Sequence, residues 1–335
     1  MVYQKPSLSF LFLKVAIALV FAACALPQAN ADAALLLEEP FGRLGHVAPT
    51  GHVAVYLSEI CAESPTQLRM CKPGEAGVVI SRYRNVAGYD WLAVPLIPYL
   101  YAVENPKDIP ESANTEQIAT LRDEYRQAHL QSIAPDDPNG SPPAGEWTEL
   151  VGSAYDRKIY GFFVPTTRPQ DEALIAQLNS TVNRRRFNVL SHNCADFART
   201  ILNFYYPHAV HRSWLIDAGI ATPKQDARSL VKYGRHHPGV TVSSFIIPQV
   251  PGSIPRSKTV DGVLDGLLKS KKYVLPLTIL HPMITITMVT TYMNESRFNP
   301  KRDAVVVDIA HAAPPASAEA LAQTRSTLHN SGMAP

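Results

Sequence analysis

Apolar residues recur at helical spacing in the stretch that starts at Cys194. Counting from that residue, the apolar positions on one face of the predicted helix are Phe197, Ala198, Ile201, Leu202 and Tyr205. Ser191 and Asn193 are residue types that cap helix N-termini, and Pro207 ends the segment. The pattern therefore predicts an amphipathic helix with Cys194 in its first turn.

Shorter apolar runs earlier in the chain predict strands. β-branched and aromatic residues are concentrated at 51–57, 77–83, 91–94 and 158–164, and the third of these runs is expected to continue, past two prolines, to 99–103. Helical spacing indicates helices at 115–131 and at 171–184, the latter with Leu174, Ile175, Leu178 and Val182 inward. Prolines and glycines at 135–145 predict an exposed loop. Together these elements predict an α+β fold in which a small antiparallel sheet packs against the Cys-bearing helix.

The start of the chain has the pattern of an export signal. Lys5 and Lys14 precede or flank an apolar run from 15 to 25, and residues 29–31 fit a small-x-small cleavage site. We therefore expect a signal peptide at 1–31, and a periplasmic or extracellular protein. An alternative is that Cys24 becomes a lipid-modified N-terminus, but Phe21 is bulky for that motif, so this interpretation ranks second.

The remaining chain of about 300 residues is long enough for a sizeable core. We predict a domain at 32–215 with a loop insertion at about 105–150, a C-terminal extension at 216–311, and an Ala/Pro/Ser-rich disordered tail at 312–335. The net charge is only +2, and no basic stripe interleaved with aromatic residues is present, which argues against nucleic-acid binding.

Cys61 and Cys71 lie in a turn-rich stretch and are expected to form a disulfide in an oxidising compartment. A bridge across so short a loop contributes about 2–3 kcal/mol. Metal binding by this pair is the weaker interpretation, because two thiols do not complete a tetrahedral site.

An apolar run near the C-terminus leaves several interpretations open. Residues 274–293 contain no Asp, Glu, Lys or Arg, while lysines precede the run and Lys301 and Arg302 follow it. About 20 apolar residues can span a bilayer. Two prolines, a histidine and many threonines argue against a span, and the alternation at 284–287 favours buried strands. An interfacial segment is the third interpretation. Just before this run, 260–268 has the spacing of a short amphipathic helix.

Cys194 is the cysteine left without an explanation by export or pairing. A helix N-terminus carries about half a positive charge, which favours the thiolate that a nucleophilic cysteine needs. The alternative is a small buried apolar residue.

A nucleophilic thiol also needs a base, which near neutral pH is a histidine. His52 opens a predicted core strand, and such an element fixes the position of a side chain. The competing interpretation of His52 is structural. The other histidines considered lie at exposed, loop-rich or helix-preceding positions: His129, His192, His208, His211, His236 and His237.

Two short motifs carry a resemblance to a known family. Gly51 and His52 are followed by Tyr56 and Leu57 on an early strand, and Asn193 and Cys194 are followed by Phe197 and Ala198 on a late helix. This order resembles the circularly permuted NlpC-like branch of the papain-like fold, to which lecithin:retinol acyltransferase and many bacterial thiol hydrolases belong. The resemblance covers about residues 45–206. It implies that Cys194 is the nucleophile and His52 the general base.

The same resemblance implies a third polar residue on the strand after the histidine strand. That strand contains no histidine or carboxylate here, so Ser81 and Tyr83 are the candidates on it, and Asp90 before the next strand is another. This departure from the family pattern bears on activity more than on fold.

These features lead to three hypotheses. The first is an exported cysteine hydrolase of the amidase or peptidase type, with a cell-wall peptide as one substrate class and esters or lipid amides as others. The second is a membrane-associated thiol acyltransferase, favoured if 274–293 binds lipid. The third is a non-enzymatic binding relative. No phosphate-binding glycine loop or closed metal constellation is present in the sequence, so we expect no cofactor and no metal.

Overall fold

A seven-stranded, mostly antiparallel sheet forms the centre of the protein in a computed structural model that describes residues 31–42, 50–143, 146–293 and 298–307. Only the pair formed by the last two strands is parallel. In spatial order the strands are β6 (Leu92–Pro95), β5 (Val78–Ser81), β2 (His52–Leu57), β1 (Ala31–Glu38), β7 (Ile159–Thr166), β8 (Ser243–Ile247) and β9 (Val305–Val306). The α+β class expected from the sequence is thereby confirmed.

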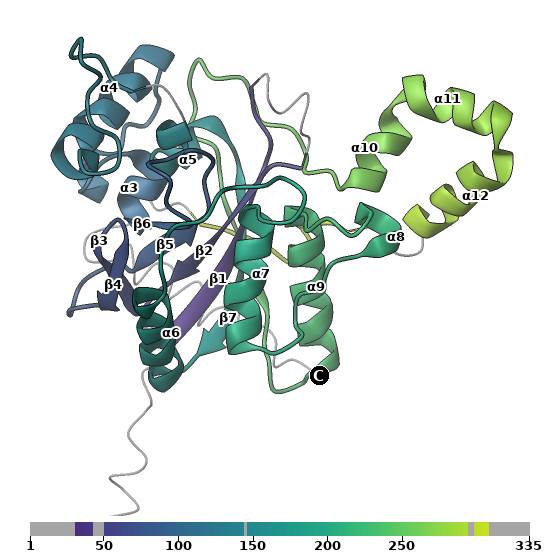
Figure 1. Ribbon diagram of the computed structural model, residues 1–335, viewed down its shortest axis with the longest axis horizontal. Coiled ribbons are helices and arrows are strands. Elements are labelled where there is room, and N and C mark those ends of the chain that lie inside the picture. Colours follow the sequence, from purple (N-terminus) through teal and green to yellow (C-terminus); the bar gives the residue numbers. More distant parts are fainter. Residues whose placement is uncertain (1–30, 43–49, 144–145, 294–297, 308–335) are drawn as a thin grey trace, which may run out of the picture.

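The sheet is covered on both faces (Figure 1). Against one face pack α3 (Leu96–Tyr101), α4 (Thr115–Tyr125) with its π-helical continuation (Arg126–Leu130), and α5 (Ser153–Asp156). Against the other pack α6 (Arg168–Ser180), α7 (Cys194–Tyr205) and α9 (Pro223–His236). Short 3-10 turns (Pro106–Asp108 and Glu146–Leu150) and the hairpin β3 (Ile60–Ser64) with β4 (Gln67–Met70) complete the body.

Strand β1 lies at the centre of the sheet and was not expected from the sequence. Alternate residues enter opposite cores: Ala34 and Leu36 pack on the α3 side, and Leu35 and Leu37 on the α7 side. A strand buried on both faces shows no polar alternation, which explains why the periodicity does not reveal it.

Most of the other expected elements are confirmed, including the strands β2, β5, β6 and β7 and the helices α4, α6 and α7. The expected strand at 99–103 is wrong, because its first three residues lie in helix α3 and Ala102 caps that helix. Pro98 is the third residue of that helix, where a backbone N–H would have no intrahelical partner in any case. Val182 is 84% exposed and not inward, because α6 already ends at Ser180.

The segment after residue 215 also contains regular structure that the sequence pattern did not indicate. Helix α9 packs on the same face as α7, and β8 pairs with β7 in the main sheet. The region described as a C-terminal extension thus contributes to both the sheet and its helical cover. The insertion at about 105–150 contains α4, the helix expected from the sequence, in addition to loops.

The apolar run at 274–293 is helical, so the interpretation of this run as buried strands is wrong. It forms α11 (Lys271–Leu280) and α12 (Pro282–Thr291), which follow α10 (Val263–Lys269) in an arm that projects from the body near α8 (Trp214–Asp217) (Figure 1). Within the described ranges, no helix combines the length and the apolar character of a membrane-spanning segment. Residues 1–30 of the expected signal peptide and the whole expected tail lie outside the described residues, whereas Ala31, the last residue of that expected peptide, opens β1.

Cys61 and Cys71 form the expected disulfide, with an S–S distance of 2.03 Å. It ties β3 to the residue that follows β4.

Candidate functional site

Cys194 is the first residue of α7, and its neighbours cap the helix. The Oδ1 atom of Asn193 accepts from the backbone N–H of Asp196 at 2.9 Å, and the Asp196 carboxylate accepts from the backbone N–H of Asn193 at 3.5 Å. This reciprocal cap uses the N–H groups of other residues, whereas that of Cys194 has no intrahelical acceptor in the first turn. A thiol here lies at the positive end of the helix dipole.

His52 is the first residue of β2 and is 9% exposed. Gly51 precedes it with φ +68, in the left-handed region that residues with a side chain rarely adopt. A Cβ atom at Gly51 would lie 2.1 Å from the carbonyl oxygen of Glu38. Glycine therefore lets β2 begin directly against β1, opposite Glu38, and this fixes the place of the imidazole.

The structure brings His52 and Cys194 together, as the sequence predicted for the pair. Both side chains line one cavity, and they lie close enough for Cys194 to influence the charge of the imidazole. Burial alone lowers the pKa of His52, but the thiolate charge of Cys194 and the carboxylate of Glu38 outweigh burial and raise that pKa to about 9. The environment therefore favours a charged imidazole beside the sulfur.

Ser81 on β5 contacts the opposite side of the imidazole. Its hydroxyl donates to the carbonyl oxygen of Val53 at 2.7 Å, and its Oγ lies 3.1 Å from Nε2 of His52. Because the single hydroxyl proton is committed to Val53, Ser81 accepts from His52 and Nε2 carries the proton. The other ring nitrogen, Nδ1, then remains for Cys194. Of the three candidates for a third polar residue, Ser81 is the one bonded to His52.

Tyr83 and Asp90, the other two candidates, have different contacts. The ring of Tyr83 stacks on that of His52, with 5.2 Å between centroids, so it restricts the imidazole without a hydrogen bond to it. Asp90 pairs instead with Arg82 and with His192, whose Nε2 is 2.6 Å from Oδ1 of the carboxylate. The sequence-based option of Asp90 as the orienting group of His52 is thus not what the structure contains.

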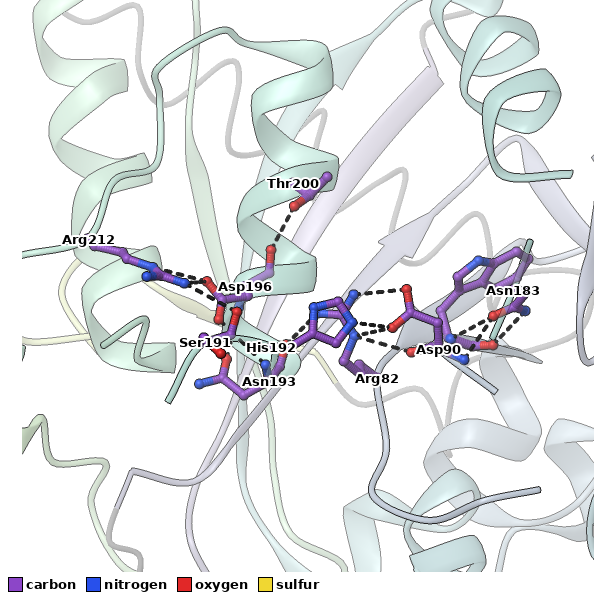
Figure 2. Close-up of polar contacts among 10 residues, drawn as sticks. Arg82, Asp90, Asn183, Ser191, His192, Asn193, Asp196, Thr200 and Arg212 are labelled. Atoms are coloured by element: carbon purple, nitrogen blue, oxygen red, sulfur yellow. Dashed lines mark hydrogen bonds and ion pairs between the residues drawn. The ribbon is translucent and has the colours of Figure 1, made fainter. Parts of the chain in front are cut away.

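Asp90 belongs to a polar network that holds the start of α7 (Figure 2). The guanidinium of Arg82 contacts both oxygens of the Asp90 carboxylate and donates through NH1 to the carbonyl oxygen of Asn193 at 3.0 Å. On the other side of the helix start, Arg212 donates to the Asp196 carboxylate at 2.6 Å. Arg82 thereby connects β5 to the residue immediately before Cys194, and this sets the distance between the two elements of the site.

A buried ionic group lies behind His52. The carboxylate of Glu38 is 1% exposed, accepts hydrogen bonds from Tyr99 and Ser153, and lies 3.3 Å from NH1 of Arg157. Arg157 also contacts Glu149 at 3.3 Å. Glu38 raises and Arg157 lowers the pKa of His52, so this group tunes the charge of the imidazole.

A second buried carboxyl, on Asp226 of α9, lies near the thiol from the helical side. Neither of its oxygens has a hydrogen-bond partner among the described residues. Burial, and next the negative charge of Cys194, raise the pKa of Asp226 well above its usual range. Burial therefore disfavours a negative charge on this carboxyl beside the sulfur.

The cavity that contains Cys194 and His52 has a volume of about 730 Å³. Charged residues line one side of it, among them Arg82, Arg84, Glu146, Glu149 and Arg157. Apolar side chains line another, including Ile220, Val263, Leu267 and Tyr273 from the segment before α9 and from the arm. The site can accommodate a substrate with a polar and an apolar part.

Metal-binding residue types gather at one place in the described part of the chain, away from Cys194. The one group of three metal-binding residue types found there is Cys61, Cys71 and Glu75, and both of its sulfurs are in the disulfide. His129 pairs with Glu104 on the surface, far in sequence from the site, and His192 points to Asp90.

The sequence analysis missed Glu38, Arg82 and Arg157. Two of them had a signal: the acidic pair at 38–39 ends an apolar run, and Arg82 directly follows the buried residues of a predicted strand. Charged residues at such positions are buried only with partners, which sequence spacing alone does not identify.

Comparison of the chain with protein-family models, with curated proteins and with solved structures gave no match.

Proposed function

We propose that the protein is a cysteine hydrolase in which Cys194 is the nucleophile and His52 the general base. The observation that carries this proposal is the placement of Cys194 beside His52 in one cavity of about 730 Å³, with Ser81 on the far nitrogen of the imidazole. A thiol at a helix start, a base and a group that orients the base are the components of nucleophilic acyl transfer.

The mechanism follows from these positions. The proton of Cys194 passes to Nδ1 of His52, and the thiolate sulfur attacks an amide or ester carbonyl carbon. The backbone N–H of Cys194 is the donor for the oxygen that becomes negative. The C–N or C–O bond then breaks, and the leaving group takes the proton from His52. Water attacks the resulting thioester, which releases the acid and restores the thiol.

The fold relationship is part of the same proposal. A histidine strand that precedes the cysteine helix in sequence, and an antiparallel sheet against which that helix packs, support a permuted papain-like domain of the NlpC-like type. Export to a periplasmic or extracellular compartment is supported by the disulfide between Cys61 and Cys71. A cell-wall peptide is then one substrate class.

A membrane-associated acyltransferase is the second candidate, favoured by the apolar wall that α10 and Tyr273 contribute to the cavity. In that case an alcohol or amine replaces water in the second half-reaction. A binding protein of the same fold is the third candidate, and it predicts an unreactive thiol.

The test is alkylation of Cys194 by iodoacetamide, followed by a panel of fluorogenic peptide amides and acyl esters. We expect rapid alkylation near neutral pH that slows in His52→Ala, together with turnover that disappears in Cys194→Ala and in His52→Ala. The matched control is His129→Ala, because that histidine is exposed and contacts Glu104 and the ring of Tyr125, neither of which lines the cavity. Turnover retained in Cys194→Ala refutes the assignment, and alkylation indifferent to His52 favours the binding protein. Stimulation by added alcohols or amines identifies a transferase.

A further inference from the structure

The arm formed by α11 and α12 exposes a continuous apolar surface to solvent. The two helices form a hairpin whose turn lies at His281 and Pro282, and no charged residue occurs from 273 to 293. Near the turn, Ile279, Leu280 and Met283 are 73%, 71% and 72% exposed. Apolar side chains gathered in this way on a projecting element indicate a surface that contacts something other than water.

Three threonines of the hairpin have a hydrogen-bond acceptor within their own helix. Thr278 donates to the carbonyl oxygen of Val274 at 2.7 Å, Thr287 to that of Met283 at 2.9 Å, and Thr290 to that of Ile286 at 2.9 Å. Each hydroxyl proton is thus used by the helix itself, one turn back. This arrangement permits a threonine-rich helix to enter an apolar medium at little cost.

Positive charge is placed at the base of the hairpin and absent from its turn. Lys271 and Lys272 are exposed, and neither has an acidic partner among the described residues, whereas Lys269 pairs with Asp261. After the hairpin the chain returns to the body, where the ring of Phe298 packs on Phe162 with 5.8 Å between centroids, and Lys301 and Arg302 follow. In a bilayer, the apolar turn of the hairpin would lie in the hydrocarbon, and the lysines at its other end would lie at the layer of anionic headgroups.

The length of the helices sets how deep the hairpin can reach. Ten residues at about 1.5 Å per residue make each helix about 15 Å long, which is half of a hydrocarbon core of about 30 Å. Both ends of the hairpin are attached to the same body, so it can enter one leaflet and return.

We infer that α11 and α12 dock the protein on an anionic lipid bilayer by inserting into one leaflet. Leu267 and Tyr273, which lie at the base of the arm, also line the cavity of Cys194. Docking therefore places the mouth of that cavity at the headgroup layer. The inference does not depend on the proposed chemistry, because it rests on the arm alone.

The test is co-sedimentation of the full chain with vesicles of phosphatidylcholine, with and without phosphatidylglycerol. Binding is expected to be strongest with the anionic lipid and to weaken with salt. Leu280→Asp, which places a charge at the tip, should lower the partition coefficient at least about tenfold. Lys271→Glu with Lys272→Glu should remove the preference for phosphatidylglycerol. The control is Val182→Asp, because Val182 is as exposed but lies outside the arm.

Each alternative occupant gives a different result. Dimers in light scattering that Leu280→Asp dissociates, without vesicle binding, mean that a second copy covers the hairpin and overturn the inference. No vesicle binding by a monomer also overturns it, as does binding that Leu280→Asp leaves unchanged. Cys194→Ala should bind vesicles like the wild type, so loss of activity and loss of docking are measured separately.

Discussion

Removal of the Ser81 hydroxyl tests whether this side chain controls the charge of His52. In Ser81→Ala, the Nε2–H group of the imidazole loses its acceptor at 3.1 Å, in a place where Ser81 is fully buried and water does not replace it. A hydrogen bond made by a charged group is worth about 1.5–3 kcal/mol, and one pKa unit corresponds to about 1.4 kcal/mol. The pKa of His52, about 9 in the wild type, should therefore fall by about one to two.

The consequence is a smaller population of the thiolate–imidazolium pair near neutral pH. Alkylation of Cys194 by iodoacetamide, followed by mass spectrometry across the pH range, measures that population. We expect the wild type to react rapidly well below the pKa of about 8.5 of an ordinary cysteine. Ser81→Ala should react more slowly near neutral pH, by about tenfold for every 1.4 kcal/mol lost, with a profile closer to that of an ordinary thiol.

Two further variants separate orientation from stability. Ser81→Thr keeps the hydroxyl and should keep the reactivity. Ser64→Ala removes a strand hydroxyl that bonds only locally, to Thr66, and should change neither reactivity nor melting temperature. If Ser81→Ala reacts like the wild type at every pH, the hydrogen bond does not set the charge of His52, and the reasoning from its geometry is wrong.

Three other perturbations have definite expected outcomes. Arg82→Gln removes the guanidinium charge that pairs with the Asp90 carboxylate and the donor to the carbonyl oxygen of Asn193. Because Arg82 is largely buried, the variant should lower the free energy of unfolding in urea by about 3 kcal/mol. As a control, Arg168→Gln breaks an exposed pair with Glu172 and should cost less than about 1 kcal/mol. Asp226→Asn removes a carboxyl whose pKa is raised in the folded state. In the wild type the unfolded chain releases this proton more readily than the folded protein does, so the folded protein loses stability as pH rises above about 4. The variant should therefore melt at a higher temperature, by a margin that grows toward alkaline pH, and a margin that shrinks contradicts the assignment. Reduction of the Cys61–Cys71 disulfide should lower stability by about 2–3 kcal/mol in the wild type and have no effect in a double alanine variant.

The sequence was most informative where one face of an element is buried. Helix α7 was predicted with Cys194 in its first turn, because its apolar residues follow the helical period and Ser191 and Asn193 are cap residue types. The pairing of His52 with Cys194 was reached from residue types, motif order and a family resemblance. It could not be derived from local pattern alone, since 142 positions separate the two residues, from 52 to 194.

The elements that escaped the sequence analysis are those for which tertiary contacts override the pattern. Strand β1 has apolar residues toward both faces, so it lacks the alternation that reveals an exposed strand. Asp90 was a sensible candidate for orienting His52, but its carboxylate is taken by Arg82 from the strand next to it. Which of two nearby polar groups pairs with a buried carboxylate depends on side-chain geometry in the folded state. The spacing of residues along the sequence does not encode that geometry.

The central position of β1 bears on the order in which the protein can assemble. The ribosome makes this strand early, and β2 can join it soon after as an antiparallel neighbour, but its other edge pairs with β7, which ends at Thr166. Until more than a hundred further residues have been synthesised, one edge of an apolar strand stays open, and such edges attract other chains. Long-range pairing of this kind also slows folding, because a large loop must close first. Nascent chains that stop before β7 should therefore be prone to aggregate and dependent on chaperones.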